Sequence, residues 1–174
     1  MINKFLNFVI CILVGIFFFE HANANEEFIF NVTEIDITEN GNLIVGSKNG
    51  KAETNDGYEI IAENFVYNKL TNILKASGNV KLLNKNDNIV IFSDKATYLR
   101  NDEIVFTNGN TSALIENKYK FISTNVKYKK KIQELSSKEK SQVIDNDENI
   151  YNLDNFIYQA DKKLLKGVNV NIIS

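Results

Sequence analysis

The sequence contains almost no cysteine or histidine, and it contains no proline or tryptophan. Cys11 and His21 are the single residues of their types, and both lie within the first 24 positions. Residues 25–174 therefore cannot form a disulfide, a Cys/His zinc site, a thiol nucleophile, or a Ser-His or Cys-His catalytic pair. These absences narrow the chemistry that is open to the protein, and we predict that it uses no metal ion or other cofactor.

The positive and negative charges of the chain are also nearly balanced. The chain carries 20 Lys and Arg against 22 Asp and Glu, and the net charge stays at −2 when Lys4 and Glu20 are left out with the first 24 residues. A chain so close to neutral has no strong electric field with which to attract a polyanion. We therefore expect no nucleic-acid partner.

The start of the chain has the features of an export signal. Lys4 precedes a largely apolar run at positions 5–19, and the small-x-small pattern Ala-Asn-Ala follows at 22–24. A retained membrane anchor is the alternative, but the apolar run is shorter than the ~20 residues that a spanning helix needs. The sequence predicts a cleaved signal peptide over residues 1–24 and one exported domain over residues 25–174.

A tyrosine recurs at a nearly constant interval through this domain. Tyr67, Tyr98, Tyr128 and Tyr158 stand 31, 30 and 30 residues apart. Each tyrosine closes a similar phrase, from IAENFVY in the first copy to NLDNFIY in the fourth. A fixed period of this length is typical of a protein built from repeated supersecondary units.

A glycine follows each of the first two tyrosines by eleven residues, in Gly78-Asn79-Val80 and Gly109-Asn110-Thr111. The fourth copy has Gly167, whereas the third copy has Glu139 where the glycine is expected. With a weaker opening unit, about five repeats of about 30 residues would fill residues 25–174 and leave no room for a second domain.

Within a repeat, the spacing of apolar residues is that of β-strands. Ile60 and Ala62 share one face, and Phe65 and Tyr67 share one face with the parity shifted by one residue. Because strand side chains alternate strictly, this shift predicts a bulge or a corner at residues 63–64.

Polar stretches such as residues 68–72 and 100–103 follow the tyrosines and predict hairpin turns. No stretch has a sustained helical stripe. We therefore predict an all-β fold, an antiparallel β-jelly roll or slightly open twisted β-sandwich built from the repeats. A parallel β-solenoid is the alternative, but the frequent hairpin signals favour antiparallel pairing.

The phrase Ile-x-Ala-Glu/Asp-x-Phe/Ala-x-Tyr, closed by Gly-Asn-Val and repeated behind an export signal, resembles the OstA-like domain of the lipopolysaccharide transport proteins. That family includes LptA, the N-terminal periplasmic domain of LptD and the related LptC. The resemblance covers residues 28–173 and is clearest at 58–83 and 89–111.

The resemblance implies a periplasmic, non-enzymatic bridge protein. Its twisted jelly roll would hold the acyl chains of lipid A in an apolar groove and would stack edge to edge with like domains, which include LptC-like and LptD-like partners or further copies of itself. The energy for transport would come from an ATPase at the inner membrane, so that the bridge itself does no chemistry.

The repeats also indicate which residues would line such a groove. If the units stack in register, the recurring apolar columns point inward, and small residues such as Ala62 and Ser93 leave space beside them. The candidate groove residues are Ile60, Phe65, Tyr67, Ile91, Ala96, Tyr98, Phe121, Val126, Tyr128, Phe156 and Tyr158. The alternative is that these columns form only a closed core.

The two ends of the domain are strand-like and poor in charge, which is typical of edges that accept a strand from another chain. The candidate edge residues are Phe28, Phe30, Val32, Val168, Val170 and Ile172. Alternatively, the two ends pair to close a barrel, or the chain is a piece of a longer LptD-like protein.

Two other functions are compatible with the repeat. An LptC-like protein would keep the N-terminal segment as an inner-membrane anchor. A secreted β-solenoid that binds or modifies carbohydrate would need exposed acidic and aromatic residues on one face, but the aromatic residues fall in the inward columns and tryptophan is missing.

Overall fold

The structure is a computed structural model that describes residues 28–55 and 57–174. These residues form one sheet of fifteen strands, in which all strand pairs are antiparallel. The strands are β1 (Ile29–Thr38), β2 (Leu43–Glu53), β3 (Tyr58–Ala62), β4 (Asn64–Asn68), β5 (Ile73–Asn84), β6 (Ile89–Leu99), β7 (Ile104–Ile115), β8 (Tyr119–Thr124), β9 (Lys127–Lys129), β10 (Glu134–Ser137), β11 (Ser141–Ile144), β12 (Ile150–Leu153), β13 (Asn155–Gln159), β14 (Leu164–Val168) and β15 (Asn171–Ile173). Two 3-10 turns, η1 (Glu39–Gly41) and η2 (Lys130–Ile132), join strands. The predicted all-β antiparallel fold is confirmed, and the parallel solenoid is excluded.

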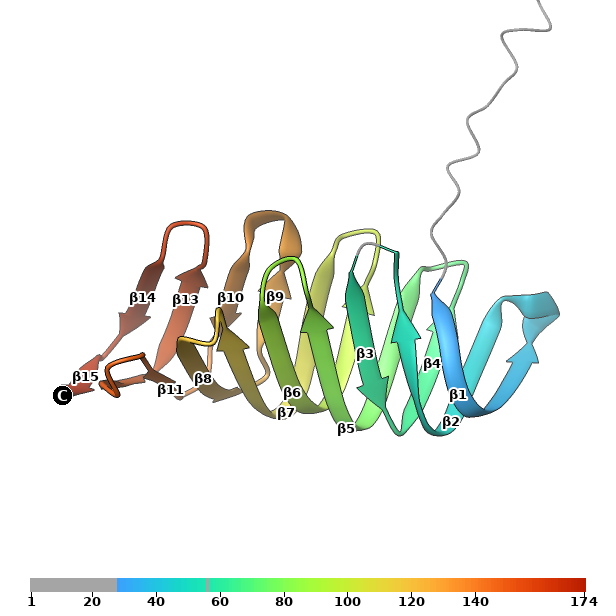
Figure 1. Ribbon diagram of the computed structural model, residues 1–174, viewed down its shortest axis with the longest axis horizontal. Helices are drawn as coiled ribbons and strands as arrows, with labels where there is room; N and C mark the ends of the chain where they lie inside the picture. Colours follow the sequence, from blue (N-terminus) through green and yellow to red (C-terminus); the bar gives the residue numbers. More distant parts are fainter. Residues whose placement is uncertain (1–27, 56) are drawn as a thin grey trace, which may run out of the picture.

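The sheet is folded lengthwise into two walls (Figure 1). Strand β5 pairs with β4 over its first half and with β3 over its second half, and β7 pairs in the same way with β9 and then β8. Wall A consists of β3, β8, β11, β12 and β15 with residues 80–84, 89–93 and 111–115 of the long strands. Wall B consists of β4, β9, β10, β13 and β14 with residues 73–77, 95–99 and 104–108. Strands β1 and β2 also contribute to both walls, because residues 50–53 of β2 pair with β3 and residues 43–46 pair with β4.

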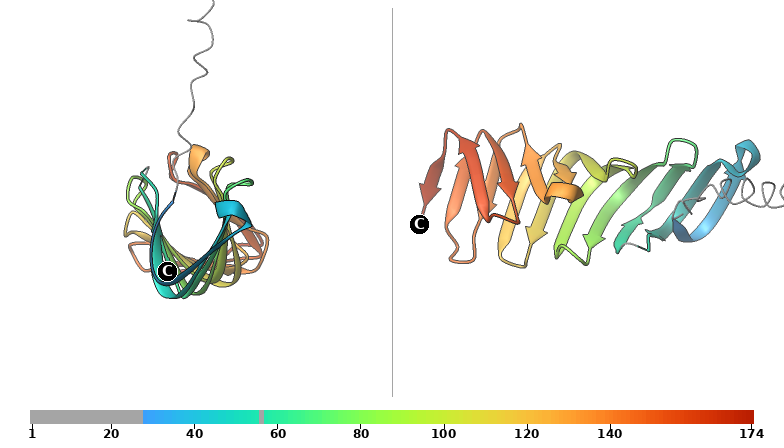
Figure 2. Two further views of the ribbon diagram at one scale, coloured as in Figure 1. Left: turned by 90° about the vertical axis from the view of Figure 1, so that its right-hand side faces the viewer. Right: turned by 90° about the horizontal axis from the view of Figure 1, so that it is seen from above.

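The walls meet along one side of the molecule and separate along the other, as the end-on view of Figure 2 shows. At the shared side, the register between β5 and β6 shifts between Ser77 and Val80. The parity of burial shifts there too, because Ala62 in β3 and Phe65 in β4 are both buried although they are three positions apart. The predicted corner at residues 63–64 is therefore present.

The recurring glycines are needed at this corner for their backbone conformation. Gly78 and Gly109 have φ angles of +80° and +93°, which L side chains rarely adopt. A Cβ atom would also collide with the carboxylate of Glu63 at the first position and of Asp94 at the second. The Asn110 N–H donates to Asp94 Oδ2 at 3.2 Å, so this recurring acid binds a backbone group of the corner.

The third repeat has Glu139 at the corner position that Gly78 and Gly109 occupy in the first two. Where β5 and β7 run continuously through the corner, the equivalent strand is interrupted around Glu139 and forms β10 and β11. Two serines satisfy the freed backbone, because Ser137 Oγ accepts from the Glu139 N–H at 3.0 Å and Ser141 Oγ donates to the Glu139 carbonyl at 2.7 Å. The repeat is therefore kept although its strand is divided, and the fourth repeat, which has Gly167, is divided into β14 and β15 in the same way.

The ends of the sheet are open edges. Among the described strands, β1 pairs with β2 alone, β15 with β12 alone, and β14 with β13 alone. Closure of the two ends into a barrel does not occur within residues 28–55 and 57–174. The predicted signal peptide lies outside these residues, and none of the helices that they form is long and apolar enough to cross a membrane.

Candidate functional site

The interior between the two walls contains every candidate groove residue. All eleven side chains face this interior and are at most 5% exposed. They are Ile60, Phe65, Tyr67, Ile91, Ala96, Tyr98, Phe121, Val126, Tyr128, Phe156 and Tyr158. The columns therefore do stack in register and point inward. The chain's own side chains fill the space between them, and a role in lipid binding stays a prediction.

Aromatic rings from the two walls meet in the C-terminal half of this interior. The Phe121 ring of β8 lies 5.1 Å from the Phe156 ring and 5.0 Å from the Tyr158 ring of β13, measured between centroids. Tyr119 on wall A lies 5.6 Å from Tyr158. Contacts of this kind hold two surfaces together without hydrogen bonds, so they can be exchanged for other apolar contacts.

The N-terminal end of the interior is closed by Phe28. Its ring lies 5.0 Å from Tyr67 and 6.0 Å from Tyr98, and the Arg100 guanidinium lies 5.3 Å from its centroid. Its side chain is 6% exposed, so it belongs to the core and is not presented at the edge where the sequence placed it. Phe28 is buried because it packs on the rings of Tyr67 and Tyr98. The alternation of residues 28–32 does not predict this contact, because both tyrosines lie far away in the sequence.

The remaining candidate edge residues differ between the two ends. Phe30 and Val32 in β1 are half-buried against the core. At the C-terminal end, Val168, Val170 and Ile172 are 51%, 47% and 60% exposed. Exposed apolar side chains are thus present at both open edges, because β1 also exposes Ile29, Ile35 and Ile37, at 59%, 48% and 59%.

A row of hydroxyl groups lines the corner below the aromatic rings. Ser93 and Thr111 lie 3.1 Å apart, and Thr111 donates to Thr107 at 2.8 Å. Further along, the hydroxyls of Ser123 and Ser141 lie 2.8 Å apart. Ser93 was expected to leave space for a ligand, but its hydroxyl bonds Thr111 on the neighbouring strand, and Thr111 bonds Thr107 within β7. The repeated Ser and Thr residues beside the corner are the feature of the sequence from which this row could have been predicted.

The open side of the molecule carries a small cavity near the C-terminal end. It has a volume of about 200 Å³ and lies between β8, β11 and β12 of wall A and β13 and β14 of wall B. Its lining residues are Tyr119, Phe121, Val143, Asp145, Tyr151, Tyr158, Lys163 and Leu165. The interior is thus accessible from this side, through an opening that is mainly apolar with two charged groups.

Two tyrosines of the interior have raised pKa values. Burial raises the pKa of Tyr128 far above its ordinary range, and a hydrogen bond to the Asp87 carboxylate raises it further. Burial raises the pKa of Tyr158 to about 12. Both phenols are therefore neutral at physiological pH, and neither is an acid or a base suited to catalysis near neutrality.

The raised pKa of Tyr158 predicts how the protein responds to alkali. Since the folded state holds this proton more tightly than the unfolded chain, its contribution to stability is complete below pH 10 and is lost as the pH rises through 12. Tyr158→Phe should therefore lose less stability between pH 8 and pH 11 than the unchanged protein. Urea unfolding at the two pH values measures this, and an equal loss in both proteins would contradict it.

Comparisons with known proteins bear on this geometry. No family model matches the sequence, and no curated protein matches it. Among solved structures, LptH of Pseudomonas aeruginosa has a TM-score of 0.61 and 11% identity to this chain, and the match covers 68% of this chain and 95% of LptH. LptH is described as the LptA homologous periplasmic component of the conserved lipopolysaccharide transport device. The fold is that of an LptA homologue.

The LptA-like fold confirms the expectation drawn from the OstA-like repeat phrase. At 11% identity the likeness lies in the arrangement of the strands, which the repeats specify through their glycines, their parity shift and their inward apolar columns. The interior has an open side because, among the described strands, no backbone pairing joins wall A to wall B there.

Proposed function

We propose that this protein is a periplasmic, non-enzymatic component of a lipopolysaccharide transport bridge and that it binds the acyl chains of lipid A between walls A and B. The observation that carries this proposal is the long apolar interior with one open side, lined by aromatic side chains from both walls. The likeness to LptH supports the choice of lipopolysaccharide as the ligand.

An acyl chain would have to replace contacts that the two walls now make with each other. Burying it gains about 0.8 kcal/mol per methylene, so a chain of about ten methylenes gains about 8 kcal/mol before its ordering cost. Separating the walls on their open side breaks ring contacts such as Phe121–Phe156, and it leaves the backbone ladders within each wall intact. The exchange therefore sets the burial of the acyl chain against lost side-chain contacts alone, and not against backbone hydrogen bonds.

The open edges support a second element of the proposal, which is head-to-tail stacking. Strand β1 at one end and strands β14 and β15 at the other can each add a strand from a like domain, whether a second copy or an LptC-like or LptD-like protein. Stacking would align the apolar interiors of successive domains, and the exposed side chains of Val170 and Ile172 would become buried.

Photo-crosslinking tests the binding site. A benzophenone amino acid at Phe65, Tyr98 or Phe156 should give adducts with lipopolysaccharide, because these positions lie between the walls. Lys85, whose side chain is 69% exposed on wall A, serves as the control and should give none. Equal adducts at all four positions, or none at any of them, would contradict lipid binding in the interior and would leave the fold unaffected.

A further inference from the structure

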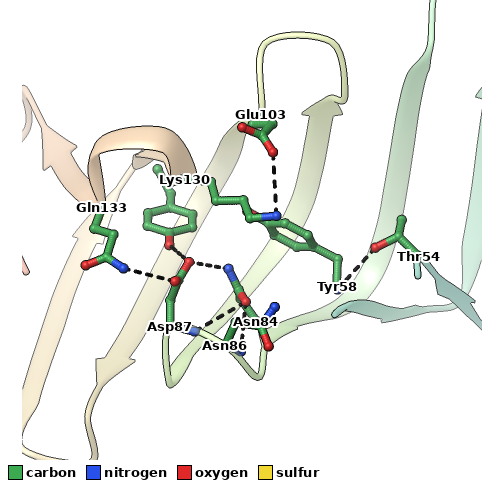
Figure 3. A network of polar contacts seen from close by, with 9 residues as sticks. Thr54, Tyr58, Asn84, Asn86, Asp87, Glu103, Lys130 and Gln133 are labelled. Atoms are coloured by element: carbon green, nitrogen blue, oxygen red, sulfur yellow. Dashed lines mark hydrogen bonds and ion pairs between the residues drawn. The ribbon is translucent and has the colours of Figure 1, made fainter. Parts of the chain in front are cut away.

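Polar side chains join the two walls midway along the open side (Figure 3). Asp87 lies in the turn between β5 and β6, at the edge of wall A. Its carboxylate accepts from the Tyr128 hydroxyl at 2.6 Å and from Gln133 Nε2 at 3.1 Å, and both donors belong to wall B. These contacts link residues 41 and 46 positions apart in the sequence.

The Asp87 carboxylate is held in place by its own turn. Asn84 is 1% exposed, and its side-chain oxygen accepts from the backbone N–H groups of Asn86 at 3.1 Å and of Asp87 at 3.4 Å. The Asn84 amide also donates to Asp87 Oδ2. A buried asparagine thus orients the carboxylate toward wall B. Because the Asp87 side chain is already held in this orientation, it loses little conformational entropy when it contacts wall B.

A lysine makes a second link beside the first. Lys130 of η2 lies 3.5 Å from Glu103 on wall B, and its ammonium lies 4.9 Å from the ring centroid of Tyr58 on wall A. The Tyr58 ring lies 4.9 Å from Tyr98, one of the candidate groove residues. The polar links therefore lie directly over the aromatic interior.

We propose that Asp87, Tyr128, Gln133, Lys130 and Tyr58 form a clasp across the open side, which must open before an acyl chain can enter the interior at this level. This inference rests on the proposed lipid-binding function and adds a control element to it. A chain that enters from the open side has to cross the line between Asp87 and Tyr128. The links are side-chain contacts, and Asp87 is only half-buried, so water can take over its hydrogen bonds when the clasp opens.

The apparent affinity for lipid equals the affinity of the open form multiplied by the fraction of molecules in which the clasp is open. A clasp that is locked shut should therefore weaken lipid binding, whereas a clasp with fewer contacts should make lipid uptake faster. Locking the clasp and removing its contacts thus change lipid binding in opposite directions. A contact that only stabilised the fold would change the free energy of unfolding and would not produce these opposite effects on lipid binding.

A reversible cross-link tests the proposal. Asp87→Cys and Gln133→Cys are introduced together with Cys11→Ser and are joined by a short bifunctional methanethiosulfonate reagent, and binding of fluorescently labelled lipopolysaccharide is followed by anisotropy. The cross-linked protein should bind at least about tenfold more weakly than the same protein after reduction. The matched control is Glu59→Cys with Lys85→Cys, an ion pair at 3.4 Å that lies wholly on wall A, and its cross-link should leave binding unchanged.

The outcomes separate the clasp from the function on which it rests. If the reduced protein binds and the cross-linked protein binds equally well, the clasp proposal is overturned and the proposed function stands. If neither form binds, both are overturned. Asp87→Ala provides an independent measurement in a chain without a cross-link. It should take up the labelled lipid about threefold faster or more, and an unchanged or slower rate would also overturn the clasp.

Discussion

Phe121→Ala is expected to lower the free energy of unfolding by about 3–5 kcal/mol. The Phe121 side chain is 1% exposed and touches the rings of Phe156 and Tyr158 on the opposite wall, so the change removes contacts that hold the two walls together. Few groups nearby can fill the space, because the backbone ladders of β8 and its neighbours fix the wall on which Phe121 stands. Denaturant unfolding followed by circular dichroism measures the change.

Phe92→Ala is the matched control for this prediction. Phe92 is also a phenylalanine in wall A, but its side chain points to the outer surface and is 46% exposed. Its replacement should cost less than about 1 kcal/mol. Equal losses for Phe92 and Phe121 would mean that the inner and outer faces of wall A contribute alike, which is incompatible with an apolar core between the walls.

Replacing Val170 and Ile172 together by aspartate should strongly weaken head-to-tail assembly and leave the monomer folded. Both side chains are about half exposed in the single chain, so the monomer loses little. In a stacked assembly each would bury the exposed half of an apolar side chain, worth about half of the 1.5–3 kcal/mol of full burial, and the aspartates would instead bury charge. The dissociation constant should therefore rise by about 100-fold or more. Sedimentation velocity over a range of concentrations measures it.

Leu70→Asp is the control for the edge substitutions. Leu70 lies in the turn between β4 and β5 and is 73% exposed, and it is part of neither open edge. Assembly of this variant should match that of the unchanged protein. If the edge variant assembles as well as the Leu70 variant does, strands β14 and β15 are not the contact between domains.

Much of the architecture could be predicted from the repeat alone. The period placed Phe65, Tyr98 and Phe156 on the inner surface, and the structure confirms these positions. The shift of parity at residues 63–64 correctly indicated a corner, because alternation along a strand is a local rule that tertiary contacts did not override. The fold class followed from these two observations, and the likeness to LptH agrees with it.

Features that join distant positions could not be predicted. The spacing of the repeat gives no reason to pair Asp87 with Gln133, since these residues lie in turns of different repeats. Burial of Phe28 was missed for the same reason, because its partners Tyr67 and Tyr98 lie in two other repeats. Ser93 was expected to leave free space, but its hydroxyl bonds Thr111, since the sequence shows that a residue is small but not which neighbour its hydroxyl meets.

By itself the sequence determined the strands, their inward faces and the bend in each repeat, because alternation and glycine conformation act over a few residues. Only the tertiary structure decided how the two walls contact each other across the open side. That contact depends on which turns of walls A and B face one another after the whole sheet has folded. The aromatic packing of Phe121 and the clasp at Asp87 both arise at this level.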